Sequence, residues 1–276
     1  MALPSSGQIT LNQIHVEAGG SSGSQVGIND SDVRGLISKG SATQMAFSEW
    51  YGASSVSISG SSHVGDAATT TSSFPNGNVN LSSGSKLVVV AVSAKVTGTS
   101  TTDLPSAVSC GGTAMTKAVS TGPVRDSGNL GGIASIWYLQ TSLSGTQLIS
   151  GTMGGSTGPN GMVVYEVTGH NTSSPIYSTA TASNPSSLGT SLGITINALS
   201  GSTIIISGNA YNGNNSINQS ATINADFASG GRSFFGARKD SVGSGNTTYT
   251  ISSDNSTTGA GSVNNGLFVL AGIAIQ

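Results

Sequence analysis

Hydrophobic and polar residues alternate in short stretches along most of this chain, and glycine, serine and asparagine separate the stretches. After residue 56 the stretches recur at short intervals, a rhythm typical of a β-sandwich or jelly roll. We therefore expect a mainly β fold here, without helices. The strongest predicted strands cover residues 86–96, 133–139, 162–167, 202–207 and 266–275. Weaker ones cover residues 107–110, 115–119, 147–153, 176–182, 192–198, 221–227, 233–238 and 247–252.

The alternation also predicts which faces of the strands are buried. In the stretch 162–167, Val163, Tyr165 and Val167 share one face and Glu166 lies on the other. The stretch 266–275 is apolar on both faces, which predicts a central strand in a sheet that is covered on both sides. We expect residues 54–276 to form one large sandwich, and two smaller sandwiches divided near 183–189 are the alternative.

Residues 8–52 follow a different pattern, which repeats. The stretches 8–13, 25–30 and 44–49 each read glutamine, apolar, small, apolar, then Asn or Ser and an acidic residue or its amide. The spaced apolar residues predict a short strand, and the Asn or Ser predicts a helix N-cap. An acidic residue after the cap suits the first helical turn. A small N-terminal module of short strands and helices is therefore expected, with helices over 13–18, 30–38 and 49–51.

A module this small cannot bury much apolar surface. Units below about 40–50 residues usually need disulfides, a metal or a partner surface. Cys110 is the one cysteine of the chain and is expected to be a small buried hydrophobe. We therefore expect residues 1–53 to dock on another protein. The candidate docking residues are Leu11, Asn12, Ile14, Asn29, Asp30, Arg34, Phe47, Trp50 and Tyr51. For the last two, packing in the module's own core is the alternative.

The same region resembles a known module. Its sequence contains LNQIHVEAG at 11–19, INDSDVRGL at 28–36 and FSEWYG at 47–52. These words are similar to a small N-terminal module of virion proteins, often tail or fibre proteins, of tailed bacteriophages, especially marine phages and cyanophages. Gln13 and Glu49 stand where Asp is commoner in that module. The resemblance implies a virion component that docks through its N-terminal module.

The later strands carry a second resemblance. An apolar stretch at 87–92 is followed by CGGTAM at 110–115, ASIWYL at 134–139 and VVYEV at 163–167. This order is similar to a β-sandwich domain of phage virion proteins and uncharacterised bacterial proteins. It implies the same mainly β, jelly-roll-like fold that the alternation predicts.

The composition narrows the class of partner. Charged residues make up 7% of the chain, the formal charge is −2 and the pI is near 5.8. Hydrophobic residues reach 36% and occur in β-branched runs, which favours ordered β structure over disorder. The sequence shows no cluster of basic residues that would bind nucleic acid or an anionic membrane. Charged residues on edge strands normally prevent edge-to-edge pairing between molecules. Because this chain has few of them, we expect a homo-oligomer.

The sequence predicts no catalytic, metal or cofactor site. His15, His63 and His170 are far apart, and none has a second ligand type at metal spacing. The acidic stretch at 29–32 is expected to cap a helix, because the residues after it break the alternation of ligands that a calcium loop needs. We therefore do not expect an enzyme.

These observations lead us to expect a structural virion protein of a tailed bacteriophage. It would be a tail-associated or short fibre protein for host adsorption, with other virion proteins as partners. Loops at 209–219 and 253–265, rich in Asn, Ser and Gly, are candidate contacts for a host surface glycan. A capsid decoration or head fibre protein is the first alternative, and a free carbohydrate-binding module is the second.

The two termini bear on location. The N-terminus lacks the basic start and apolar core of a signal peptide. The longest apolar run, 267–275, is too short to span a bilayer as a helix. The expected location is the virion, assembled in the cytoplasm of the bacterial host without membrane insertion.

Overall fold

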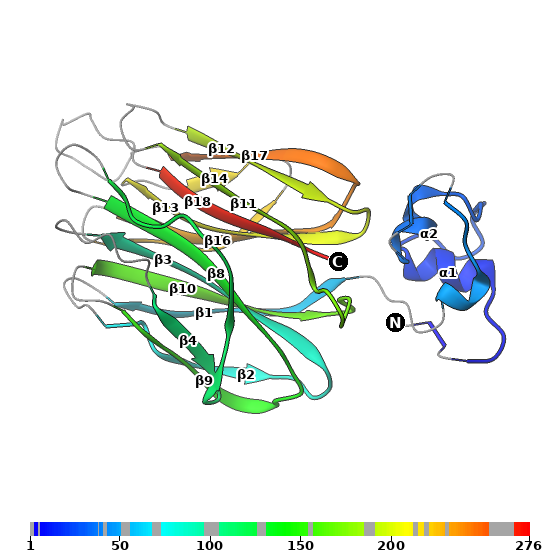
Figure 1. Ribbon diagram of the computed structural model, residues 1–276, viewed down its shortest axis with the longest axis horizontal. Coiled ribbons are helices and arrows are strands. Elements are labelled where there is room, and N and C mark those ends of the chain that lie inside the picture. The colour runs from blue at the N-terminus through cyan, green and yellow to red at the C-terminus, as the bar shows by residue number, and fades with distance from the viewer. Residues whose placement is uncertain are drawn as a thin grey trace.

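The computed structural model describes two parts of the chain, a small N-terminal module (residues 3–50) and a β body (residues 56–276). In Figure 1 the module lies at one end of the body, beside the C-terminus. The residues that the structure describes are 3–4, 6–37, 39–40, 43–50, 56–67, 73–96, 105–125, 131–153, 157–184, 191–211, 215–217, 221–229, 232–253 and 268–276.

The module contains three short helices, α1 (Leu11–Glu17), α2 (Ser31–Gly35) and the 3₁₀ helix η1 (Phe47–Trp50). Each is near its predicted position, but the caps differ. Thr10 caps α1: its Oγ1 accepts the Gln13 N–H at 3.2 Å, and Gln13 Oε1 accepts the Thr10 N–H at 2.8 Å. This reciprocal pair is a capping box, and it places the start of α1 before the predicted cap Asn12. Asp30 occupies the N-cap of α2, in place of the predicted Asn29.

The short strands predicted within 8–11, 25–28 and 44–47 were wrong, because no described residue of the module is in a strand. A strand needs a neighbour with which to pair its backbone groups, and these stretches have none. Their apolar residues pack instead around Ile14, Val33 and Trp50. The apolar spacing thus reflects contact with a small core and not a β-ladder.

The β body consists of strands, and none of its described residues is helical, as the sequence predicted. Its strands are β1 (Ser57–Ala67), β2 (Gly77–Leu81), β3 (Lys86–Val96), β4 (Ala107–Cys110), β5 (Thr113–Ala114), β6 (Thr116–Ser120), β7 (Val124–Arg125), β8 (Gly131–Thr141), β9 (Gly145–Thr152), β10 (Thr157–Thr168), β11 (Ile176–Asn184), β12 (Ser191–Ala198), β13 (Ser202–Tyr211), β14 (Asn215–Ile217), β15 (Thr222–Ser229), β16 (Arg232–Val242), β17 (Gly245–Ser253) and β18 (Phe268–Ile275).

The strands pair antiparallel into four sheets, here named A to D. Sheet A has the order β1-β10-β3-β8-β6, with β7 also paired to β8, and sheet B has the order β2-β9-β4-β5. Sheet C has the order β11-β18-β13-β16-β15, and sheet D has the order β12-β17-β14. The predicted mainly β, sandwich-like fold is confirmed.

The sheets stack in the order B, A, C, D, with a hydrophobic cluster in each gap (Figure 1). Strand β3 shows the consequence. Val88, Val90 and Val92 point toward sheet B, and Leu87 and Val89 point toward sheet C. Strand β18 is likewise buried on both faces, which confirms the prediction of a central final strand. Both inner sheets are therefore covered on both sides.

The body is an internal duplication. The strand order of sheet A matches that of sheet C when each strand of the first half is matched with its equivalent in the second half. The equivalent pairs are β1 and β11, β10 and β18, β3 and β13, β8 and β16, and β6 and β15. In the same way, β2-β9-β4 of sheet B matches β12-β17-β14 of sheet D. The strand order of each half is similar to that of a jelly roll, except that β6 and β15 pair in the inner sheets A and C. The halves meet at residues 169–175, whereas the boundary predicted near 183–189 falls inside the second half, between β11 and β12.

The two jelly rolls are related by an approximate two-fold axis. Across the gap between sheets A and C, β1 lies against β15 and β6 against β11, while β10 lies against β16 and β8 against β18. Each contact has a partner contact in which the halves exchange roles, with β3 and β13 at the centre. Such an arrangement is what a symmetric homodimer would have. The chain is therefore built like a dimer of jelly rolls fused into one polypeptide.

Side chains of the two halves fit together closely at this central gap. Gly236 on β16 leaves room for a large residue on sheet A, since a Cβ there would lie 2.6 Å from Val163 Cγ2 and 2.8 Å from the Tyr165 hydroxyl. A hydrogen bond also crosses this gap: Ser207 Oγ donates to the Val92 carbonyl at 2.9 Å. The fit of large against small residues fixes how the two halves pack.

Candidate functional site

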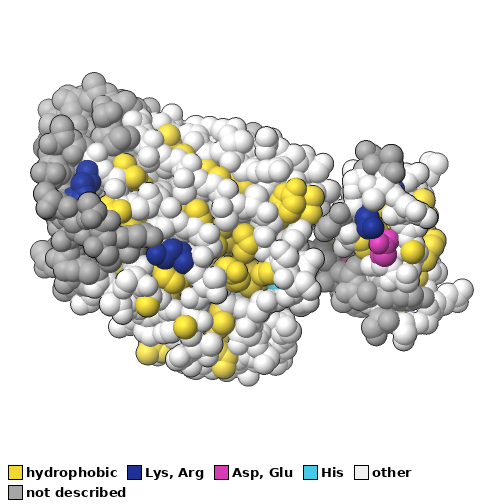
Figure 2. Space-filling model, viewed as in Figure 1, with side chains coloured by type: hydrophobic (Ala, Val, Ile, Leu, Met, Phe, Trp, Pro, Cys, Tyr) yellow, Lys and Arg dark blue, Asp and Glu magenta, His cyan; other side chains and the backbone are white. Residues whose placement is uncertain are grey.

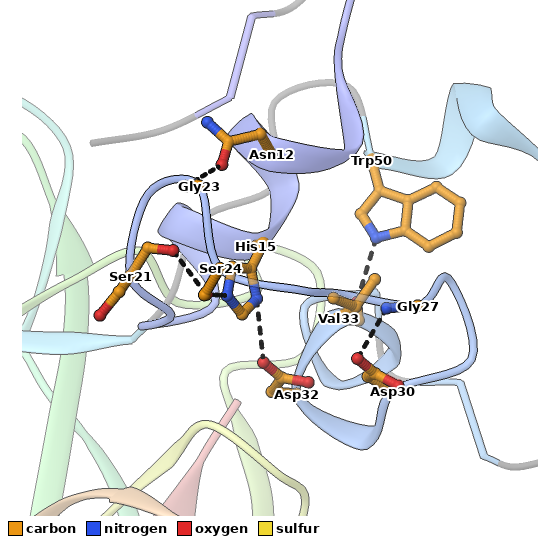
Figure 3. Close-up of polar contacts among 10 residues, drawn as sticks. All are labelled: Asn12, His15, Ser21, Gly23, Ser24, Gly27, Asp30, Asp32, Val33 and Trp50. Carbon is orange, nitrogen blue, oxygen red and sulfur yellow. Dashed lines mark hydrogen bonds and ion pairs between the residues drawn. The ribbon is translucent and has the colours of Figure 1, made fainter.

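The module has a small core of its own. Leu3, Ile14, Val33 and Trp50 are buried in it, and Trp50 is fully covered. The Trp50 indole N–H donates to the Val33 carbonyl at 3.1 Å (Figure 3), which joins η1 to α2. Of the two alternatives for Trp50, the structure thus shows packing in the module's core.

Arg34 binds backbone and side-chain oxygens on both sides of α2, including the segment that leads to η1. Its side chain is 3% exposed, and its guanidinium donates to the Asn29 side chain at 2.8 Å and to the Thr43 carbonyl at 2.7 Å. It also donates to the Gly40 carbonyl. Five fixed donors make arginine suited to gathering several oxygens in this way. Arg34 therefore holds the module together and is not available to a partner.

Polar contacts tie the loop after α1 to the helix (Figure 3). Asn12 Oδ1 accepts the Gly23 N–H at 2.9 Å, and His15 Nε2 lies 2.7 Å from Ser24 Oγ. Gly20 packs directly on the imidazole, because a Cβ there would lie 2.1 Å from the His15 ring. These contacts are internal to the module, so Asn12 serves its fold although the residue is exposed.

Ser24, His15 and Asp32 lie in the order of a nucleophilic triad, with 3.6 Å between His15 Nδ1 and Asp32 Oδ2 (Figure 3). A triad also needs a free hydroxyl and N–H donors for an oxyanion. Ser24 Oγ instead donates to the Ser21 carbonyl at 2.7 Å, and the N–H groups of Gly23 and Ser24 are already bonded. The arrangement joins α1 to α2 and lacks the parts for acyl transfer.

The module exposes two large apolar side chains, Val16 at 44% and Phe47 at 49%. The Phe47 ring lies against Trp50 with 5.6 Å between centroids, so its inner edge is fixed while its outer face is free. Nearby, Lys39 pairs with Glu49 at 2.8 Å, and this contact lowers the pKa of Glu49. Figure 2 shows apolar side chains on the margin of the module away from the body.

The predicted docking residues thus divide into groups. Ile14, Arg34 and Trp50 are interior, and Leu11 is half-buried. The exposed ones are Asn12, Asn29, Asp30 and Phe47. Tyr51 lies outside the described residues. Val16 was missed, although its position two residues after the buried Ile14 places it on the opposite face of α1.

A cleft of about 640 Å³ lies between the module and the nearest end of the body. Its walls come from α2 and from the β10–β11, β12–β13 and β16–β17 connections. The parts touch at Gly35, where a Cβ would lie 2.8 Å from the Ser200 carbonyl oxygen. His170 lies in the body wall, where burial lowers its pKa. Its Nε2 accepts from Gln140 Nε2 at 3.3 Å.

Among the described residues, no group of three or more His, Cys, Asp or Glu side chains could hold a metal ion. No helix in the same part of the chain is long and apolar enough to cross a membrane. No family model, curated protein or solved structure matches the chain significantly. The residues and their geometry therefore carry the functional argument alone.

Proposed function

We propose that this chain is a structural, non-enzymatic virion protein of a tailed bacteriophage. The module docks it on the particle, and the β body is displayed outward. The observation that carries the proposal is the module itself, a small folded unit at one end of the body that leaves Val16 and Phe47 exposed. Exposed apolar side chains on a unit this small are suited to a partner surface. The resemblance of residues 11–52 to a phage docking module supports the same role.

The arrangement of the body supports display away from the docking end. β13 begins at Ser202 and β18 is followed by Gln276, and both residues line the cleft beside the module. The other ends of these strands therefore lie at the far end of the body. Of the two stretches expected to contact glycans, 209–219 was predicted as a loop but contains the end of β13 and the strand β14, and 253–265 starts at the last residue of β17. Residues 212–214, 218–219 and 254–265 lie outside the described residues.

The favoured role is a tail-associated or short fibre protein for host adsorption, with self-association into a homo-oligomer. A jelly roll is also common in capsid and lectin domains, so a capsid decoration protein is the second candidate. Fold alone does not decide between these roles. Location does, because adsorption proteins sit on the tail and decoration proteins cover the head.

Two experiments test the proposal. Deleting residues 1–53 should abolish incorporation of the protein into particles. Normal incorporation of the shortened chain would refute the docking role of the module. Immunogold labelling of intact virions with antibodies against the β body should give gold confined to the tail. Gold spread over the head would instead assign the protein to the decoration class. Virions without gold on either the tail or the head would contradict a virion role.

A further inference from the structure

The two outer sheets of the body lack Asp, Glu, Lys, Arg and His on every strand. The charged residues that lie on strands all belong to sheets A and C. They are Asp66, Lys86, Lys95, Lys117, Arg125, Glu166, Asp226, Arg232, Arg238, Lys239 and Asp240. Charge normally gathers on the elements that face solvent. Here the sheets in the middle of the stack carry it and the outward sheets do not.

Figure 2 agrees with this distribution. Among the side chains that it colours on the body, Lys and Arg appear over the middle of the stack and near the end away from the module, and Asp and Glu are absent. The margins formed by sheets B and D are white and yellow. The described margins visible in this view thus show no charged side chain, in agreement with the sequences of the outer strands.

Sheet D presents a regular array of hydroxyl and amide groups. On its strands β12 and β17, Thr195 lies opposite Thr248 and Asn197 lies opposite Asn246. All four residues are exposed, and the two threonine hydroxyls are 2.8 Å apart. On the opposite faces of these strands, Ile194, Ile196, Tyr249 and Ile251 are buried against sheet C. Pairing to the neighbouring strand and the stiffness of threonine at χ1 hold the array in place.

The chemistry of this face selects its partner. Without charge it cannot attract nucleic acid, an anionic membrane or an acidic polysaccharide. Protein interfaces favour aromatic residues, Met and Arg and are poor in Ser. None of the large hydrophobic side chains found exposed among the described residues lies on sheet D. Hydroxyl and amide groups, which both donate and accept, instead match the hydroxyl groups of an uncharged sugar chain.

We propose that the outer face of sheet D, built on β12 and β17, binds an uncharged polysaccharide. The proposal rests on the adsorption role above and deepens it, because it moves glycan contact from the far-end loops to a sheet face. A flat face without an exposed aromatic ring binds each sugar segment weakly. Useful affinity then comes from several copies of the protein engaging one polymer.

The test uses the full chain in native gels that contain dextran, mannan or galactomannan, with dextran sulfate as the charged comparison. At least one neutral polymer should retard the protein, and dextran sulfate should not. The double variant Thr195→Ala/Thr248→Ala should lose at least tenfold in apparent affinity. Thr146→Ala, an exposed threonine on sheet B, is the matched control and should bind as the parent chain does.

Retardation by none of the neutral polymers, or equal retardation of the double variant, would overturn the proposal. Sedimentation of the same proteins provides a second reading. If the double variant abolishes self-association, then a second copy occupies the face and the glycan assignment is wrong. Particle incorporation separates this result from the docking role, because the double variant should incorporate normally even if residues 1–53 are essential.

Discussion

Replacing Phe47 by alanine separates docking from folding. The side chain is 49% exposed, and full burial of an aromatic residue covers roughly 150–250 Å². A partner that covers the exposed part of Phe47 would therefore bury roughly 100 Å², which contributes about 2.5 kcal/mol at ~25 cal/mol per Å². Phe47→Ala should thus weaken docking by roughly 50- to 100-fold.

The assay is the binding of purified full chain to particles assembled without it, with the bound fraction measured against concentration. Leu148→Ala is the matched control, because Leu148 is 48% exposed but lies on β9 of the body. It should dock like the parent chain. Equal affinities for Phe47→Ala and Leu148→Ala would refute the assignment of Phe47 to the docking surface.

A second substitution in the same helix removes the fold and not only the contact. Trp50 is fully buried, and truncation of a buried aromatic residue to alanine costs about 3–5 kcal/mol. The module has few other buried hydrophobic residues, so Trp50→Ala should unfold it and leave the body intact. Amide hydrogen exchange should then show lost protection in α1 and α2 only. Phe47→Ala should keep that protection, which distinguishes a lost surface from a lost fold.

Three further predictions concern the body. Gly236→Ala should lower stability by about 1–3 kcal/mol, because its Cβ meets Val163, whereas Gly243→Ala, in open space, should stay within about 0.5 kcal/mol in thermal unfolding. Tyr165→Phe should raise stability by about 1 kcal/mol, because the buried hydroxyl has no hydrogen-bond partner in the described part of the chain; an unchanged denaturation midpoint would contradict this. Burial lowers the pKa of His170, so its contribution to stability is full above about pH 6.5 and is lost as the pH falls. His170→Gln should remove that loss in melting curves between about pH 7 and 5, and parallel curves for the two proteins would show that the reasoning is wrong.

Most strands of the body could be predicted from the sequence because each has a local pattern of apolar residues. The strand β3 (Lys86–Val96) is marked by a β-branched run, and β10 (Thr157–Thr168) contains an alternating stretch with Glu166 on the face opposite Val163. Both of these faces are covered in the structure, and Glu166 is 8% exposed. The strand β2 (Gly77–Leu81) was not predicted, because only Val79 and Leu81 mark it among Gly and Asn. Local pattern thus detects strands that are rich in apolar residues and overlooks short, polar ones.

The stacking of the sheets could not be read in the same way. Which sheet covers which depends on pairs such as Gly236 with Tyr165, which are far apart in sequence and individually unremarkable. For the module, the sequence predicted the unit but not the contacts of its individual residues. Its residues were recognised as a unit, but Arg34 was assigned to a docking surface and Trp50 was left open between that surface and the module's core. The structure shows that the contacts of both residues are internal. Sequence spacing gives a residue's neighbours on one element and does not say what that element packs against.

The internal two-fold arrangement links these observations. A single jelly roll would leave one apolar sheet face uncovered, and in this chain each half covers that face of the other. The body therefore needs no partner to bury its central sheets, which leaves the outer sheets free to lack both charge and large exposed aromatic residues. The module carries a different surface, apolar and small, at one end of the stack. Docking through Phe47 and contact through sheet D then depend on separate parts of one chain, so each should survive the loss of the other.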